Sequence, residues 1–179
     1  MVGNPVQAAR VFNSRGVDEL AFIDIFASAQ KRKLNLKLVA DVIKECYMPV
    51  AIGGGINSVD DINDLLQIGA DKVIIKTKAI TDLAFVRKAV EFFGSQCISI
   101  AVDAIASPDG YKIHNTINKN ISLNSFIREM NECEVGELIV ASVDKDGMMD
   151  GFDIPLINEA SSLSQVPIIA VGGGGKMEH

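Results

Sequence analysis

The chain has 179 residues, of which 48% are hydrophobic and 22% charged, so it is long and apolar enough to bury a core of its own. Its formal net charge of −6 argues against a nucleic-acid partner. No apolar run approaches the roughly 18 residues of a membrane span, and the first residues do not have the pattern of a signal peptide.

The few cysteines and histidines argue against a metal site. Cys46, Cys97 and Cys133 lie in apolar segments and show no metal-ligand spacing, so we expect reduced thiols and a cytoplasmic location. His114 and His179 are the only histidines, too few for a zinc or histidine-based catalytic site. We therefore predict no metal and no cofactor.

Helical and extended patterns alternate regularly along the chain. The first helix is expected to begin at Asn4-Pro5, where a capping side chain precedes proline, and to stop at Gly16. Strands are expected at 20–25, 49–52, 72–76, 97–103, 137–143 and 167–171. Further helices are expected at 34–45, 58–69, 83–93, from Ser122 onward, and at 153–163.

The strands are continuous apolar runs, which predicts a parallel sheet buried on both faces. A hairpin-like insertion with a turn at Pro108-Asp109-Gly110 follows the fourth strand. No linker divides the chain, so residues 1–179 are expected to form one α/β domain. A doubly wound sheet and a (β/α)₈ barrel both fit this order.

An internal repeat favours the barrel. The segment Met48-Pro-Val-Ala-Ile-Gly-Gly-Gly recurs as Val166-Pro-Ile-Ile-Ala-Val-Gly-Gly, and Glu19-Leu-Ala recurs as Glu137-Leu-Ile, both with an offset of 118 residues. The repeating unit holds four strands, and two units give eight. On this count strands 2 to 7 are present, while strands 1 and 8 are missing. The predicted fold is therefore a partial (β/α)₈ barrel with two open edges.

Two glycine runs follow predicted strands, on the side of a barrel where ligands bind: Gly53-Gly54-Gly55 and Gly172 to Gly175. Glycine lets backbone N–H groups approach a phosphate closely, and a helix N-terminus adds a favourable dipole. The N–H groups of these runs, through Asn57 in the first, are expected to lack other partners. The pair suggests a ligand with a phosphate at each end; turn geometry alone is the alternative.

Carboxylates stand at several strand ends. Asp103 ends the fourth strand and is the candidate general acid or base, with a loop hydrogen bond as the alternative. Asp24, at the end of the first strand, is a weaker candidate of the same kind. Asp144 and Asp146 could position a ligand, although their Asp-x-Asp-Gly pattern is also that of an ordinary turn.

Charged residues also stand at three strand starts. Glu19, Lys72 and Glu137 begin alternate strands, which contribute to the same interior layer of a barrel, so we expect these side chains to meet. A ring of mixed sign would satisfy buried charges. Simple solvation at the strand entry is the alternative.

Six segments, taken in order, resemble the cyclase subunits of imidazole glycerol phosphate synthase: GVDELAFIDIFASAQKRK, PVAIGGGI, GADKVIIKT, FGSQCISIAVDA, GELIVASVDKDG and PIIAVGGGGKMEH. The resemblance implies a (β/α)₈-barrel enzyme of histidine biosynthesis that receives ammonia from a glutaminase subunit. Its substrate would be a bis-phosphorylated phosphoribulosyl-formimino aminoimidazole carboxamide ribotide. The products would be imidazole glycerol phosphate and an aminoimidazole ribotide.

The resemblance also implies roles for individual residues. Asp103 matches one aspartate of the family's acid–base pair, and the other would lie on strand 1, outside these residues. One phosphate site corresponds to Gly54, Gly55, Lys76 and Thr77. The other corresponds in part to Asp146, Gly147, Gly173 and Gly174. Three of the four charges at the ammonia entrance correspond to Glu19, Lys72 and Glu137.

The sequence departs from the family where the substrate would lie. Lys76 replaces an asparagine, the segment 114–119 lacks the usual glycines, and three residues replace threonines: Phe26, Ala141 and Met148. These changes are expected to crowd the substrate side. A paralogous group, closer in the segment Tyr47-Met-Pro-Val, forms an amidino sugar in surface-polysaccharide biosynthesis.

The histidine-pathway interpretation is preferred over that paralogue because its match is broader. A third possibility is a non-catalytic fragment that binds phosphates or partners. With strands 1 and 8 missing, the 179-residue chain is expected to self-associate through its open edges and to show no ammonia-dependent turnover. A chain extended at both ends would be active, with Asp103 essential.

Overall fold

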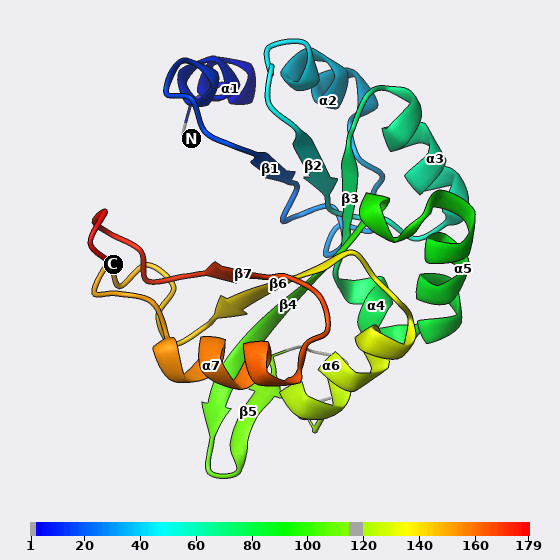
Figure 1. Ribbon diagram of the computed structural model, residues 1–179. Helices are drawn as coiled ribbons and strands as arrows, with labels where there is room; N and C mark the ends of the chain where they lie inside the picture. The colour runs from blue at the N-terminus through cyan, green and yellow to red at the C-terminus, as the bar shows by residue number, and fades with distance from the viewer. Residues whose placement is uncertain (1–2, 115–119) are drawn as a thin grey trace. The chain divides into compact units, whose positions relative to one another are not determined.

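The computed structural model describes residues 3–114 and 120–179, in two compact units, Met1–Ile98 and Ser99–His179. In each unit parallel strands alternate with helices (Figure 1). This confirms the predicted α/β class, with the elements of a partial (β/α)₈ barrel. Most of the segment 114–119, where the usual glycines are missing, lies outside the described residues. The expectation of one domain stays a prediction.

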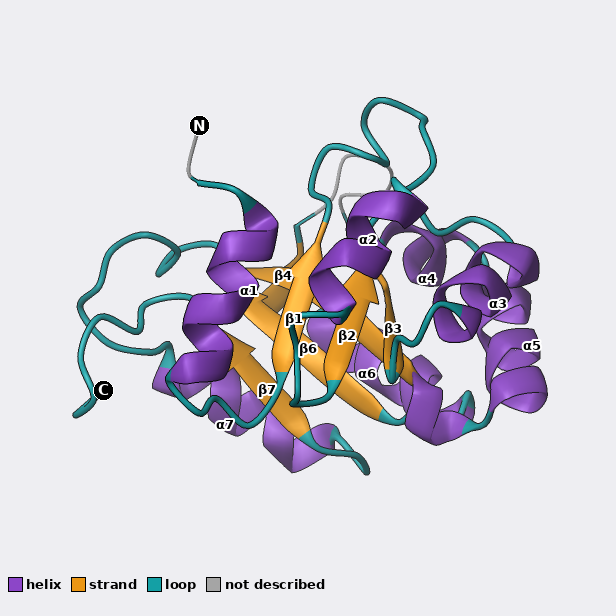
Figure 2. Ribbon diagram, turned by 90° about the horizontal axis from the view of Figure 1, so that it is seen from above, coloured by secondary structure: helices purple, strands orange, loops and turns teal. Residues whose placement is uncertain are grey.

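The first unit is built on parallel strands. In its described part these are β1 (Leu20–Ile23), β2 (Val50–Gly53) and β3 (Lys72–Ile75), paired in that order. The helices are α1 (Pro5–Ser14), α2 (Leu36–Ile43), α3 (Val59–Gln67), α4 (Thr77–Thr81) and α5 (Leu83–Phe93), followed by the 3₁₀ helix η1 (Ser95–Cys97). Helices α1 and α2 lie on the same face of these strands (Figure 2).

The second unit repeats this plan and adds a hairpin. Strand β4 (Ile98–Ser107) pairs in parallel with β6 (Glu137–Ser142), and β6 with β7 (Ile168–Val171). Strand β5 (Gly110–Ile113) runs antiparallel to β4, which confirms the hairpin predicted around Pro108-Asp109-Gly110. The helices are α6 (Leu123–Glu132) and α7 (Ile154–Leu163).

Strand β4 is longer than predicted. Its parallel pairing with β6 stops at Ala104 opposite Ser142, but antiparallel pairing with β5 carries it on to Ser107. The prediction that Asp103 ends its strand is therefore wrong: it lies inside β4, at the end of the part that runs beside β6. Helix α4 and the η1 turn were not predicted, because each is too short to show a periodic pattern.

Burial only partly follows the prediction. Val50, Ala51 and Ile52 of β2 are at most 2% exposed, as expected for a strand covered on both faces. By contrast, β1 and β7 alternate between half-buried and exposed residues, and Ile23 and Val171 are 42% and 43% exposed. Burial on both faces was thus a wrong prediction for these two strands. Each pairs with a strand on one edge only among the described residues.

The internal repeat is confirmed by the strand register. Leu20 lies opposite Val50 in the β1–β2 pair, and Leu138, 118 residues later, lies opposite Ile168 in the β6–β7 pair. The N–H of Leu20 donates to the carbonyl of Pro49 at 3.0 Å, and the N–H of Leu138 donates to the carbonyl of Pro167 at 3.0 Å.

The same offset relates side-chain hydrogen bonds. Asn13, at the end of α1, accepts from the N–H of Tyr47 at 3.1 Å, and Asn131, near the end of α6, accepts from the N–H of Gln165 at 3.1 Å. The predicted caps follow the same rule, since Asn4 caps α1 and Ser122 caps α6. The two units therefore share one local framework.

Candidate functional site

The first set of predicted phosphate-binding residues lies at one edge of the first unit. Strands β2 and β3 are parallel neighbours, with Gly53 opposite Ile74, so the segments that follow them emerge side by side. Lys76 and Thr77 are exposed there, and Thr77 begins α4. The residues brought together in this way are Gly54, Gly55, Lys76 and Thr77.

The glycines at the two equivalent turns are required by close backbone approach. Gly54 has a φ of +111°, and a Cβ there would collide with the carbonyl oxygen of Asp24. Gly172, 118 residues later, has a φ of +97°, and its Cβ would lie 2.9 Å from the carbonyl oxygen of Ser142. Both features exclude larger residues. Turn geometry by itself thus explains why these positions are glycine.

The N–H groups after β2 are partly occupied, contrary to expectation. The N–H of Gly55 donates to the hydroxyl of Ser28 at 3.3 Å. The N–H groups of Asn57 and Ser58 donate to one carboxylate oxygen of Asp61 at 3.1 and 3.0 Å. Asp61 is the third residue of α3 and completes a capping box with Ser58. The capping box of α3 therefore already satisfies the N–H groups of Asn57 and Ser58.

Asp24 follows β1 and holds its own loop. The guanidinium of Arg32 donates to both carboxylate oxygens at 2.6 and 2.9 Å, and the N–H groups of Phe26 and Ala27 donate at 3.1 Å. The bond from Arg32 is the main reason that the pKa of Asp24 lies below its usual value. This arrangement favours a loop anchor, and a catalytic role for Asp24 stays a prediction.

Asp103 lies opposite Ala141 in the β4–β6 pair. Its side chain is half-buried, and its carbonyl accepts from the N–H of His114 at 2.8 Å. The segment after β6 emerges at this same edge, because the two strands are parallel. The carboxyl group of Asp103 is therefore at the C-terminal end of the parallel part of β4, where the barrel comparison puts reacting groups.

The loop after β6, residues 143–152, carries the two other candidate aspartates. Asp144 accepts from the N–H of Ala106 at 2.9 Å, which fixes the loop to the far part of β4. The N–H of Asp146 donates to the carbonyl of Ser142 at 3.0 Å, and Asp146 and Gly147 are exposed. Asp144 thus anchors the loop to β4, whereas Asp146 is accessible to solvent.

The loop after β7 lies against the loop after β6. The carbonyl of Gly173 accepts from the N–H of Gly151 at 2.9 Å, and a Cβ on Gly173 would collide with the carbonyl of Gly151. Gly174 is exposed. The second predicted phosphate set thus lies on two loops joined by a backbone hydrogen bond.

Sequence reasoning missed a hydrogen-bonded cluster at the base of the 143–152 loop. The hydroxyl of Ser142 donates to Asp153 at 2.8 Å, and the phenol of Tyr111 on β5 donates to the other carboxylate oxygen at 2.8 Å. Asp153 also caps α7 through the N–H of Leu156. Only the capping role of Asp153 could be read from the sequence. Its partners Tyr111 and Ser142 lie 42 and 11 residues away along the chain.

Two of the charges predicted at strand starts meet in the first unit. The ammonium of Lys72 lies 2.9 Å from a carboxylate oxygen of Glu19, with side chains 23% and 33% exposed. They stand at the N-terminal ends of β3 and β1, opposite to the glycine turns. The pairing confirms the expected contact between these two residues.

Glu137 has a partner that the sequence did not reveal. At the start of β6 it is 9% exposed and accepts from the hydroxyl of Ser99 at 2.6 Å. Ser99 is fully buried and lies directly opposite Glu137 in the β4–β6 register. A hydroxyl within the apolar run of β4 was the available signal.

The substitutions relative to the family lie at exposed or half-buried positions. Phe26 and Met148 are 58% and 62% exposed, and Ala141 is half-buried beside Asp103. Whether they crowd a substrate stays a prediction.

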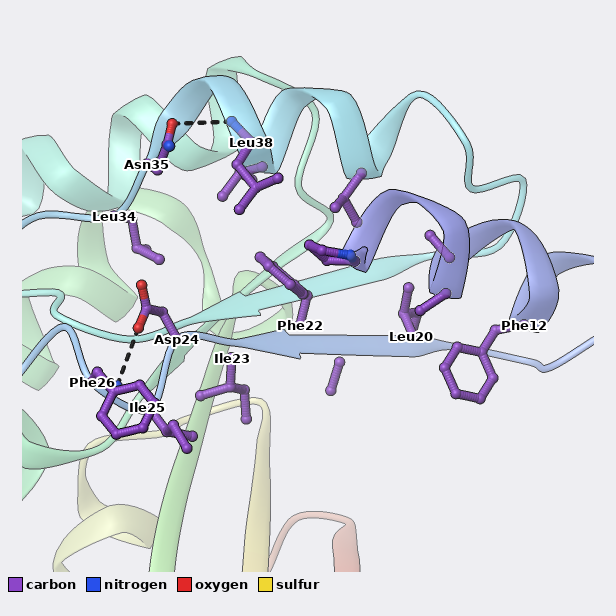
Figure 3. Close-up of a pocket in the computed structure, with 16 residues that line it drawn as sticks. Phe12, Leu20, Phe22, Ile23, Asp24, Ile25, Phe26, Leu34, Asn35 and Leu38 are labelled. Carbon is purple, nitrogen blue, oxygen red and sulfur yellow. Dashed lines mark hydrogen bonds between the residues drawn. The ribbon is translucent and has the colours of Figure 1, made fainter. Parts of the chain in front are cut away.

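An apolar pocket of the first unit lies away from most of these residues. It has a volume of about 530 Å³ and lies between α1, α2 and β1 (Figure 3). Leu20 and Phe22 point from β1 toward the helices, while Ile23 points to the other face (Figure 3). Among the sixteen described residues that line it, Asp24 is the charged one. The cavity is an apolar groove with a carboxylate at one end.

Residues 3–114 and 120–179 hold no group of three or more His, Cys, Asp or Glu side chains arranged to bind a metal ion. In the same part of the chain no helix is long and apolar enough to cross a membrane. Cys46, Cys97 and Cys133 are all free thiols.

Comparisons with known proteins identify the family of this chain. A family model described as histidine biosynthesis protein matches residues 1–179. The HisF subunit of imidazole glycerol phosphate synthase from Streptococcus mutans is 40% identical over 182 aligned residues, which cover 99% of this chain and 72% of that subunit.

Proposed function

Since the chain belongs to the histidine biosynthesis protein family and is a homologue of the HisF subunit, we propose that it is the cyclase of an imidazole glycerol phosphate synthase. The reaction uses ammonia to convert phosphoribulosyl-formimino aminoimidazole carboxamide ribotide to imidazole glycerol phosphate and aminoimidazole carboxamide ribotide. The relative's name favours this pathway over the amidino-sugar alternative.

The repeated glycine turn is the observation that carries the substrate proposal. Each unit has a glycine of positive φ at the same place, Gly54 and Gly172, followed by a second, Gly55 and Gly173. A bis-phosphorylated substrate likewise has two similar ends. Lys76 adds a positive charge beside the first turn. We assign one phosphate to each turn, with Thr77 at the first and Asp146, Gly147 and Gly174 at the second.

Asp103 is proposed as the general acid or base. Ring closure requires protons to move between nitrogen and oxygen atoms, and a positioned carboxyl group typically contributes about 10² to 10⁴-fold. Asp103 lies on a rigid strand at the edge where both loops of the second unit emerge. Asp24 remains a weaker candidate, because acting as a base would require it to release Arg32.

Ammonia is proposed to enter past the charges at the opposite strand ends, where a glutaminase subunit would dock. The Lys72–Glu19 pair supports this, because both side chains are partly exposed, so each charge can meet water when the pair opens. Glu137 with Ser99 would contribute from the second unit. A cytoplasmic location is a further part of the proposal.

Calorimetric titration with the bis-phosphorylated substrate tests the assignment. Lys76→Met should weaken binding roughly tenfold, because it removes a charged hydrogen bond from the lysine ammonium to the phosphate. Lys37→Met, which removes an exposed lysine from α2, is the matched control and should bind normally. Equal affinities in both variants would contradict the phosphate assignment, and release of the aminoimidazole ribotide with ammonium would identify the reaction.

A further inference from the structure

The loop of residues 143–152 is closed at its base by buried side chains. Ser142 precedes the loop and Asp153 follows it, and they are 1% and 8% exposed. Their 2.8 Å hydrogen bond ties the two ends of the loop together. Ser142 also holds Asp146 through its carbonyl oxygen. Any movement of this closure would therefore be transmitted to the exposed tip at Asp146 and Gly147.

The β4–β5 hairpin fastens the same loop at two points. Tyr111 of β5 donates to Asp153 at 2.8 Å, and the N–H of Ala106 on β4 donates to Asp144 at 2.9 Å. Tyr111 is half-buried, and the hairpin is itself closed by a hydrogen bond from the hydroxyl of Ser107. The hairpin thus contacts the loop near its beginning and at its end.

The protonation states suit these contacts. Burial, together with the neighbouring Asp153, raises the pKa of Tyr111 to about 12, so the phenol keeps its proton. Burial alone would raise the pKa of Asp153, but hydrogen bonds from Tyr111, Ser142 and the N–H of Leu156 outweigh it, and the pKa is lowered. An ionised carboxylate therefore meets three donors.

The Ser142–Asp153 contact can be compared with the equivalent positions of the first unit. The positions 118 residues earlier are Asp24 and Asn35. Asn35 caps α2 through the N–H of Leu38, as Asp153 caps α7, but Asp24 is bonded to Arg32 instead. The hydrogen bond between Ser142 and Asp153 is thus not repeated at the equivalent positions of the first unit.

We propose that Tyr111 and Ser142, acting through Asp153, are positioning residues that hold the 143–152 loop in its substrate-binding conformation. The β4–β5 hairpin then contributes to substrate binding, because a residue that contacts the substrate keeps its position only when the residues that support it are themselves held in place. This inference rests on the proposed function, in which Asp146 and Gly147 contact one end of the bis-phosphorylated substrate.

Tyr111→Phe removes one hydroxyl and keeps the ring. It should weaken calorimetric binding of the bis-phosphorylated substrate roughly tenfold, the effect of one hydrogen bond to a charged group. In a chain extended at both ends, the form expected to turn over, KM should rise by the same factor with kcat little changed. Amide hydrogen exchange in residues 144–152 should become faster. Tyr47→Phe, at a residue 91% exposed, is the matched control and should change none of these.

Ser142→Ala breaks the same closure from the other side and should give the same pattern. If the unaltered protein does not bind the substrate, the proposed function fails and this inference fails with it. If the unaltered protein binds, while Tyr111→Phe and Ser142→Ala bind equally well and exchange at the unaltered rate, the inference alone is overturned. A drop in kcat at constant KM would likewise overturn the positioning role.

Discussion

The two units share a backbone plan but close their equivalent turns differently. In the first unit the residue after β1 is Asp24, whose carboxylate is held by Arg32 at the surface. In the second unit the equivalent residue is Ser142, whose hydroxyl is buried against Asp153. Register, caps and glycines are thus kept across 118 residues, while the polar side chains at the strand ends differ. A duplicated framework leaves those side chains free to take separate roles.

The cores under the first helix of each unit differ in the same way. Phe126 and Met130 of α6 are at most 1% exposed, so the space between that helix and the strands is filled. The equivalent residues of α1 are Ala8 and Phe12, and Phe12 is 40% exposed and lines the apolar groove. A small residue in place of a phenylalanine, beside a strand paired on one edge, leaves a groove of about 530 Å³.

The largest expected effect distinguishes the carboxylate of Asp103 from that of Asp24. Asp103→Asn should lower kcat by about 10² to 10⁴-fold, as expected for loss of a general acid or base. Asp24→Asn should lower it far less, because Arg32 already occupies that carboxylate. The measurement is ammonium-dependent turnover by the protein that the complete gene encodes. Equal losses in the two variants would show that both units supply acid–base groups.

A smaller effect is expected on stability, where side chains under α6 should contribute more than the equivalent side chains under α1. Met130→Ala removes a fully buried side chain and should lower the free energy of unfolding by about 2 to 5 kcal/mol. Phe12→Ala, at the equivalent position, should cost less than about 1.5 kcal/mol, because much of that ring already meets solvent. Urea unfolding followed by circular dichroism measures both. A larger loss for Phe12→Ala would mean that something covers the groove.

The smallest expected effect is the pH dependence of the Asp24 anchor. The folded-state pKa of Asp24 is lowered, chiefly by Arg32, so its stabilisation is complete above the unfolded pKa of about 3.9 and is lost as pH falls through the folded value. Arg32→Gln should therefore be less stable than the unaltered protein at pH 7, by less than about 1 kcal/mol for a partly exposed pair.

This difference should shrink as pH falls through the folded-state pKa of Asp24, because the carboxyl group then becomes protonated and no longer pairs with Arg32. Urea unfolding across the pH range provides the measurement, with Arg15→Gln, at an exposed arginine, as the control. A difference independent of pH would mean that Arg32 stabilises the loop through packing and not through charge.

The sequence by itself determined the order of strands and helices, the caps, the hairpin turn and the repeat. These features are local: Asn4 caps the helix that begins at the next residue, and Ser58 with Asp61 closes a capping box within four residues. Glycines at the strand ends were also readable, because only glycine tolerates the backbone angles found at Gly54 and Gly172. Local geometry and residue type were enough for each.

Tertiary structure alone decided which polar groups meet. Ser99 contacts Glu137 because β4 and β6 pair in one particular register, and Tyr111 contacts Asp153 because the hairpin lies against the start of α7. A shift of one residue in that register would turn each side chain to the opposite face. Periodicity shows which face a residue belongs to, whereas its partner depends on how segments some 40 residues apart are aligned.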